Sequence, residues 1–314
     1  MTRVLLGILL LSLLAAAPPA GPGAAHPMAP PVKGDSVFAR SNLVAWCIVP
    51  FDAKQRGPKA RVEMLAQLGV RRVAYDWRDN HIKEWDEELT QYKAHGIELV
   101  GFWAPARHDE ILALFKRHDL KAQLWVDGPA GADGQPQSQR VESVAAALLP
   151  LARKAKDAGC TVGLYNHGGW FGEPENQIAV IEQLRKSDVD NVGIVYNLHH
   201  GESHVGRFPQ LLPKMKPYLL CLNLNGMKKG GPKILPLGQG DDDLRLLRAI
   251  RDSGYQGPVG ILNHREEIDA EQGLKQNLDG MKRLLVELKD EQALRTHPGI
   301  TVRGTSSAVP PRGE

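Results

Sequence analysis

The chain has 314 residues, of which 42% are hydrophobic and 24% are charged, and its formal net charge is +3. This composition is typical of a globular protein and allows one large domain or two small ones. The positive charge is spread along the chain without a basic block, which argues against a phosphate-neutralising surface. We therefore expect no nucleic-acid partner.

The first 25 residues have the layout of a secretory signal peptide. Thr2 and Arg3 precede a short apolar run, which ends in small residues and prolines. The run is shorter than the roughly 20 residues that span a bilayer, and no later segment is long enough, so we expect no stable membrane span. The sequence therefore predicts export, to the periplasm or to the extracellular space.

Segments rich in Pro and Gly flank a single predicted domain. Residues 26–40 are expected to form a flexible leader and residues 291–314 a disordered tail, which leaves residues 41–290 for the fold. The three cysteines, Cys47, Cys160 and Cys221, each lie beside or inside an apolar run. Exported proteins that rely on disulfides usually have an even and denser set, so we expect buried free thiols.

Eight short apolar runs alternate with segments of helical periodicity. The runs cover residues 43–50, 70–77, 97–105, 120–129, 160–167, 192–200, 218–226 and 258–264. Several of the helical segments end at a glycine shortly before the next run, namely Gly69, Gly96, Gly159 and Gly254. Eight such units in about 250 residues favour a closed (β/α)8 TIM barrel over an open doubly wound sheet.

In such a barrel the functional residues lie at the C-terminal ends of the strands. Histidines expected there can act as acids or bases near neutral pH: His167, His199 and His200. Indole rings that could stack on a sugar come from Trp46, Trp77, Trp103, Trp125 and Trp170, although any one of them could instead fill the barrel. The other expected ligand-binding residues are Asn166, Asn197, Asn223, Asn225, Asn263 and His264.

Three stretches resemble a known family: VGLYNHGGWFGEPE, VGIVYNLHHG and ILPLGQGDDDLRLLRAIRDSGYQGPVGILNH. Through them, residues 40–290 resemble the xylose isomerase-like TIM-barrel superfamily of sugar phosphate isomerases and epimerases, and its exported planctomycete-type members in particular. The resemblance implies a divalent metal held by carboxylates and a histidine at the ends of strands five to eight. It also implies proton transfer next to a substrate carbonyl.

The chain departs from this family pattern at the metal positions. Neutral residues stand where the resemblance implies ligands: Tyr165 on strand five, Asn197 on strand six, Asn223 and Asn225 on strand seven, and Leu262 or Asn263 on strand eight. Mg²⁺ and Mn²⁺ prefer oxygen anions, so we expect neither to be tightly bound. If a metal binds at all, the imidazoles of His167, His200 and His264 would suit zinc better than magnesium or manganese.

Two further sites carry acidic residues at strand ends. Asp76 and Arg78 could face a substrate or could form a local ion pair that closes the second loop. Asp127 lies in the turn sequence VDGP and is interpreted as a turn residue rather than a base.

The sequence thus predicts a sugar isomerase- or epimerase-like barrel that acts on a neutral sugar or keto-sugar. His167 or His200 would be the acid and base, and the asparagines would donate hydrogen bonds to the developing enolate, in an isomerisation, an epimerisation or a β-elimination of an oxidised glycoside. The alternative is a non-catalytic carbohydrate-binding barrel that has lost the metal site. A DNA-repair nuclease of the same superfamily would need a multi-metal cluster and a basic groove, and the sequence shows neither.

Overall fold

The computed structural model describes residues 36–129 and 134–298, so the predicted signal peptide and most of the predicted leader and tail lie outside the described residues. Eight parallel strands form a closed barrel in chain order. The strands are β1 (Leu43–Trp46), β2 (Arg72–Tyr75), β3 (Glu98–Trp103), β4 (Gln123–Val126), β5 (Thr161–Tyr165), β6 (Val192–Asn197), β7 (Leu219–Leu224) and β8 (Val259–Leu262). The predicted (β/α)8 barrel is therefore confirmed.

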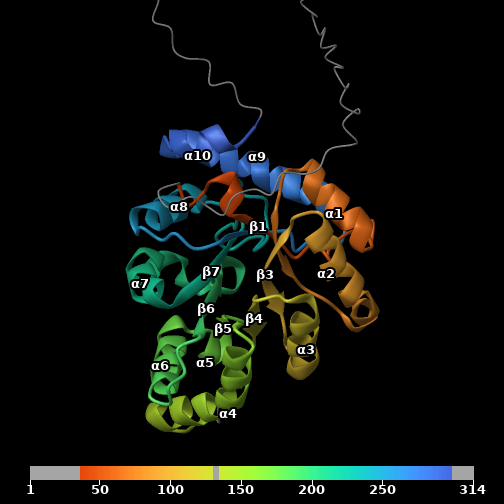
Figure 1. The fold of residues 1–314 in the computed structure, drawn as a ribbon. Helices are drawn as coiled ribbons and strands as arrows, with labels where there is room; N and C mark the ends of the chain where they lie inside the picture. Colours follow the sequence, from red (N-terminus) through yellow and green to blue (C-terminus); the bar gives the residue numbers. More distant parts are fainter. Residues whose placement is uncertain (1–35, 130–133, 299–314) are drawn as a thin grey trace, which may run out of the picture.

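Helices surround the strands and follow one another around the barrel (Figure 1). The α-helices are α1 (Pro58–Gln67), α2 (Trp85–Ala94), α3 (His108–His118), α4 (Gln137–Asp157), α5 (Gly169–Gly172), α6 (Pro174–Arg185), α7 (Phe208–Met215), α8 (Asp243–Asp252), α9 (Ala270–Leu288) and α10 (Glu291–Thr296). Short 3₁₀ turns are η1 (Arg40–Asn42), η2 (Asp79–Glu84), η3 (Leu198–His200), η4 (Glu202–Arg207) and η5 (Lys216–Tyr218).

Each observed strand lies inside one of the apolar runs that the sequence singles out. The glycines predicted to end helices have left-handed backbone angles, with φ of 64° at Gly69, 62° at Gly96, 70° at Gly159 and 68° at Gly254. Residues with a Cβ adopt this conformation at a steric cost, so glycine allows the chain to turn directly into the next strand.

The barrel has two apolar layers, one between the strands and the helices and one enclosed by the strands. The inner layer ends at the C-terminal mouth, where side chains from alternate strand positions point inward. Cys47, Cys160 and Cys221 are buried and free, as predicted. None of the helices within 36–129 and 134–298 is long and apolar enough to cross a membrane.

The two ends of the described chain pack against each other, which corrects part of the predicted boundaries. Helix α10 lies in the segment predicted to be a disordered tail. Asp290 caps it by accepting a hydrogen bond from the Ala293 amide at 3.0 Å, and Ser36 Oγ donates to the same carboxylate at 2.6 Å. His297 Nε2 lies 3.0 Å from the carbonyl oxygen of Phe38, whose ring is fully buried. Residues 36–40 and 291–297 therefore belong to the folded domain.

Candidate active site at the barrel mouth

Trp125 of β4 fills the barrel below its mouth. The side chain is fully buried, and its indole N–H donates to Gln123 Oε1 at 2.8 Å. Glycines on the two neighbouring strands make room for it, because a Cβ on Gly101 would lie 2.3 Å from the indole and one on Gly163 would lie 3.0 Å from it. The prediction that Trp125 contacts a ligand is corrected, since its ring is enclosed by the barrel.

Tyr165 lies above Trp125 at the end of β5. Its ring centroid is 4.6 Å from that of Trp103 and 6.2 Å from those of Trp46 and Trp125. The Asn197 amide donates a short hydrogen bond to the Tyr165 hydroxyl. The two side chains satisfy each other and close the floor of the mouth.

Four histidines form a connected cluster over this floor. The ring centroids are 4.5 Å apart for His167 and His200, 3.6 Å for His199 and His200, and 5.4 Å for His199 and His264. Burial, together with the nearby imidazoles and cations, lowers the pKa of His199 to about 2, of His200 to about 3 and of His264 to about 4. These three imidazoles are neutral at pH 7 and can both donate and accept hydrogen bonds.

His167 differs from the other three because it is paired with a carboxylate. Its side chain is 51% exposed, and Nδ1 lies 3.3 Å from the Asp127 carboxylate. The hydrogen bond to Asp127 raises the pKa of His167, although partial burial opposes the shift. Asp127, which the sequence analysis interpreted as a turn residue, follows β4 and also contacts this histidine. A neutral His167 that donates from Nδ1 has a free lone pair on Nε2.

The opposite wall of the mouth contains a second aspartate and a second histidine. His264 follows β8, packs on Phe51 with a centroid distance of 3.7 Å, and has its Nδ1 3.9 Å from the Cys47 thiol. Asp76 follows β2 and is only 2% exposed, and neither of its carboxylate oxygens has a hydrogen-bond partner. The predicted local ion pair between Asp76 and Arg78 is therefore not formed, and the Arg78 guanidinium donates instead to the Trp77 carbonyl at 2.7 Å.

The asparagines at the strand ends serve mainly to hold the backbone. The Asn166 amide donates to the Asn197 carbonyl, and its oxygen accepts from the Asn197 N–H at 2.7 Å. Asn225 donates to the carbonyl oxygens of Gly226 and Lys233, and Asn263 donates to that of Phe51 at 3.0 Å. Each of these side chains is buried. They shape the mouth, and the prediction that they bind ligand directly has no support from these contacts.

Asn223 and the remaining tryptophans occupy different depths of the mouth. Asn223 is fully buried with its amide nitrogen unpartnered, and Trp46 is 2% exposed with its indole N–H unpartnered. Trp77 is buried and donates to the Trp103 carbonyl at 2.6 Å. Trp103 and Trp170 are half-buried, and Trp170 donates to Gln137 at 2.9 Å. The predicted aromatic wall is therefore reduced to Trp103 and Trp170.

A family model described as xylose isomerase-like TIM barrel matches residues 62–284. The chain belongs to this family. Of the solved structures that resemble it, the zinc-bound IolI protein has 14% identity and a TM-score of 0.62, covering 82% of this chain and 100% of that one. The 3-keto-D-glucoside 4-epimerase YcjR from E. coli has 15% identity and a TM-score of 0.59, with 78% and 99% covered. L-ribulose 3-epimerase has 16% identity and a TM-score of 0.58, with 81% and 95% covered. A comparison with curated proteins finds no match.

The mouth of this xylose isomerase-like barrel does not fit a divalent metal of the kind that the family resemblance implies. The hydroxyl of Tyr165 and the amide of Asn197 are bonded to each other, and Asn225 and Asn263 hold loop carbonyls. In the part of the chain that the structure describes, no three His, Cys, Asp or Glu side chains are arranged to hold a metal ion. The zinc arrangement considered for His167, His200 and His264 is therefore not formed.

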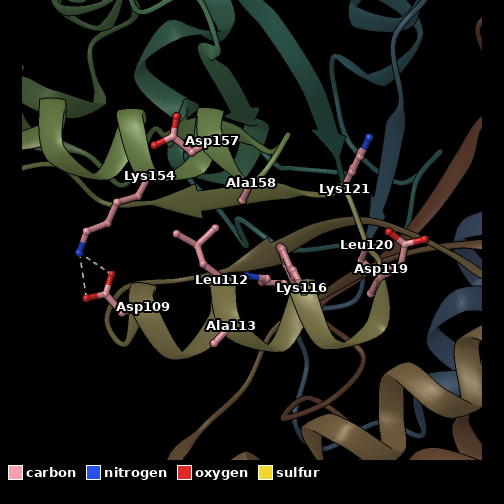
Figure 2. A pocket seen from close by; sticks show the side chains of 11 residues that line it. Asp109, Leu112, Ala113, Lys116, Asp119, Leu120, Lys121, Lys154, Asp157 and Ala158 are labelled. Carbon is pink, nitrogen blue, oxygen red and sulfur yellow. Dashed lines mark hydrogen bonds and ion pairs between the residues drawn. The ribbon is translucent and has the colours of Figure 1, made fainter.

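The hollows outside the mouth include the following two. One, of about 520 Å³, runs between α3 and the end of α4 on the side of the barrel, where Lys154 pairs with Asp109 at 2.7 Å (Figure 2). The other, of about 560 Å³, lies between the loops that follow β6 and β7 and includes Met227 and Arg245. Arg245 is paired with Asp242 at 2.7 Å. Both of these pairs lie within the lining of their own hollow.

Asp76, Asp127 and Cys47 were all considered from the sequence, but none of them was assigned to the site. Asp127 follows Trp125 by two positions and Asp76 follows Ala74 by two, so strand alternation places both on the inner face. That alternation was the available signal. No comparable signal was available for Cys47, because its position depends on a backbone turn with φ of 58° directly after β1.

Proposed function

We propose that this barrel binds a neutral keto-sugar at its mouth and moves a proton on the carbon next to the carbonyl. The observation that carries the proposal is the pair of His167 and Asp127. The half-exposed imidazole of His167 follows β5 and contacts the carboxylate of Asp127, which follows β4. Structural neighbours named as 3-keto-D-glucoside 4-epimerase and L-ribulose 3-epimerase support the choice of substrate class. The neutral character of the surrounding side chains favours a substrate without charge.

In the proposed step, Nε2 of His167 removes the proton from the carbon next to the carbonyl. The electron pair of the broken C–H bond forms a C=C bond, and the carbonyl electrons move to oxygen to give an enolate. Asp127 stabilises the imidazolium that results. Neutral imidazoles of His200 and His264 can donate hydrogen bonds to the enolate oxygen, which is the stabilisation that a metal ion would otherwise supply.

Proton exchange in deuterated water tests this function without requiring the natural substrate to be known. L-ribulose and a methyl 3-keto-D-glucoside serve as probes, and loss of the C–H signal next to the carbonyl is followed by NMR. We expect exchange with the wild type and a rate lower by about 10² or more with His167→Gln. Binding without exchange would support the carbohydrate-binding alternative, and neither binding nor exchange would contradict the substrate class.

Export is a separate proposal, because the N-terminal residues lie outside the described part of the chain. We propose that residues 1–25 are removed during secretion, on the basis of the order of basic, apolar and small residues. N-terminal sequencing of the secreted protein tests it, and recovery of Met1 would contradict it.

A further inference from the structure

The hollow between the loops that follow β6 and β7 lies beside the mouth. Its volume of about 560 Å³ is within the range of small-molecule sites, which is roughly 300–1,000 Å³. Glu202 lines it and comes two residues after His200, a member of the histidine cluster. Glu202 also pairs with Lys233 at 2.5 Å, and the Lys233 charge adds to burial in lowering the pKa of His200. This ion pair therefore adjoins both the histidines and the hollow.

The walls of the hollow come from three segments that are bonded to one another. The Asp241 amide donates to the Met227 carbonyl at 2.9 Å, and Lys228 pairs with the Asp241 carboxylate at 2.6 Å. These contacts tie the β7 loop to the residues that precede α8. Arg245 of α8 donates in turn to the Val205 carbonyl of η4 at 2.9 Å. The walls are thus held together by the protein itself, and a preformed site costs less free energy to bind a ligand.

Apolar and polar side chains are combined in the lining. Met227 and Leu246 are buried side chains that line the hollow, and Ser203 adds an exposed hydroxyl group. A pyranose ring has an apolar C–H face and a rim of hydroxyl groups, so a surface of this kind suits it.

Asp243 supplies an acceptor that the protein leaves unused. This residue lines the hollow and is only 4% exposed. Its Oδ2 accepts from the amides of Gly238 at 2.7 Å and Gly240 at 2.9 Å, whereas Oδ1 has no hydrogen-bond partner among the residues that the structure describes. A Cβ on Gly240 would lie 2.1 Å from Oδ1, so glycine at this position leaves the oxygen uncovered. A largely buried acceptor without a partner is costly, and a ligand hydroxyl that donates to it removes this cost.

The charges in the lining are balanced. They are the carboxylates of Glu202, Asp242 and Asp243 and the cations of Lys228, Lys229 and Arg245. Equal numbers of the two signs give an anion or a cation no net attraction, so the hollow favours a neutral ligand. Lys229 is exposed, and within the described part of the chain its amino group has no hydrogen-bond or ion-pair partner. It can therefore donate to a ligand.

We infer that this hollow binds a second sugar ring of the substrate, which makes the substrate a keto-glycoside rather than a free monosaccharide. The inference rests on the proposed function, because the oxidised ring has to occupy the mouth. Asp243 Oδ1 accepts from one hydroxyl group of the second ring, Lys229 donates to another, and Met227 packs on its C–H face. These residues determine specificity and take no part in the proton transfer.

The methyl group of Met227 reports whether the hollow is occupied, independently of turnover. The probes are methyl cellobioside and methyl maltoside, each oxidised at C3 of the non-reducing ring, because β and α linkages direct the second ring differently. In protein labelled with ¹³C at the methionine methyls, at least one probe should shift the Met227 signal, which Met227→Leu assigns. Met64, buried on α1, is the internal control and should not shift. A Met227 signal that neither probe shifts would overturn the inference.

Filling the hollow tests whether the second ring contributes to specificity. Gly206 lines the hollow, and a Cβ there would meet nothing within 4 Å, so a larger side chain can be introduced. In the wild type, kcat/KM for the better two-ring probe should exceed that for methyl 3-keto-D-glucoside by about tenfold. Gly206→Trp should remove this advantage, mainly through KM, whereas the matched control Gly206→Ala should keep it.

Lys229→Ala gives a second variant that does not depend on how a tryptophan packs. It removes one exposed donor and should lower the advantage of the second ring by about threefold, with kcat unchanged. An advantage that survives both Gly206→Trp and Lys229→Ala would contradict the assignment of the hollow.

The inference and the proposed function fail in different ways. If methyl 3-keto-D-glucoside exchanges its proton and the second ring adds nothing to kcat/KM, the proposed function stands and the inference is wrong. If no keto-sugar exchanges while the Met227 signal still shifts, the proposed proton transfer is wrong and the hollow is still a sugar site.

Discussion

The two walls of the mouth each hold a histidine and an aspartate, in opposite environments. On the β4–β5 wall, His167 and Asp127 are exposed to solvent and bonded to each other, and the pKa of the histidine is raised. On the β8–β1–β2 wall, His264 lies beside the Cys47 thiol and the Asp76 carboxyl group is buried. The pKa of Asp76 is raised and that of His264 is lowered, so both shifts favour the neutral form. The same residue types thus give a hydrogen-bonded pair on one wall and buried groups whose neutral forms are favoured on the other, because burial disfavours the charged form.

The largest expected effect is on stability at the buried wall. The pKa of Asp76 is about 7 in the folded protein against 3.8 for an ordinary aspartate, so the folded state loses stability as pH rises from about 4 to 7, and the loss is complete above 7. Asp76→Asn removes the ionisable group, and with it this loss of stability, so it should raise the free energy of unfolding by about 1 to 4 kcal/mol at pH 8. Below pH 4 the variant should match the wild type. Urea unfolding at the two pH values measures this change. An equal gain in the free energy of unfolding at both pH values would show that the gain does not come from the ionisation of Asp76.

The next effect is on turnover at the exposed wall. His167→Gln should lower kcat for an exchanging probe sugar by about 10², since the side chain that accepts the proton is lost. Because His167 is largely exposed, its stability should change by less than about 0.5 kcal/mol. Steady-state kinetics and urea unfolding together measure this difference between the walls. A large loss of stability would show that His167 is part of the scaffold.

A smaller effect is expected when the charge of the exposed pair is removed. Asp127 raises the pKa of His167, so Asp127→Asn should lower that pKa and move the acid limb of kcat/KM to lower pH. The maximal kcat should fall about tenfold, because the imidazolium loses its partner. A pH–rate profile measures both changes. An unmoved acid limb would mean that another group accepts the proton.

The two walls also show which features of the fold and the site could be predicted from the sequence. Short apolar runs identified all eight strands, since this signal is local. Trp125 was placed at the mouth because strand position alone does not reveal depth, which is set by Gly101 and Gly163 on the neighbouring strands. The pairing of Asp127 with His167 joins residues 40 positions apart, and no local pattern encodes it.

Another expected effect concerns the neutral histidines between the walls and appears only below neutral pH. The pKa of His199 is lowered to about 2, so its contribution to stability is present above about pH 6.5 and is lost as pH falls. His199→Gln should reduce the number of protons taken up on unfolding at pH 5 by about one. The slope of unfolding free energy against pH between 6.5 and 4 measures this. An unchanged slope would show that His199 is already protonated in the folded state.

The hydrogen bond between Asn197 and Tyr165 has a consequence for how this barrel can evolve. The Tyr165 ring packs among Trp46, Trp103 and Trp125, and its hydroxyl is matched to a neutral amide. A glutamate at position 165 would place a carboxylate against these indole rings, and its neighbour Asn197 carries no positive charge to pair with it. The substitution would therefore be destabilising until further ligands arose on other strands. Introducing a carboxylate ligand at this position must therefore pass through less stable single mutants, which favours retention of the neutral mouth.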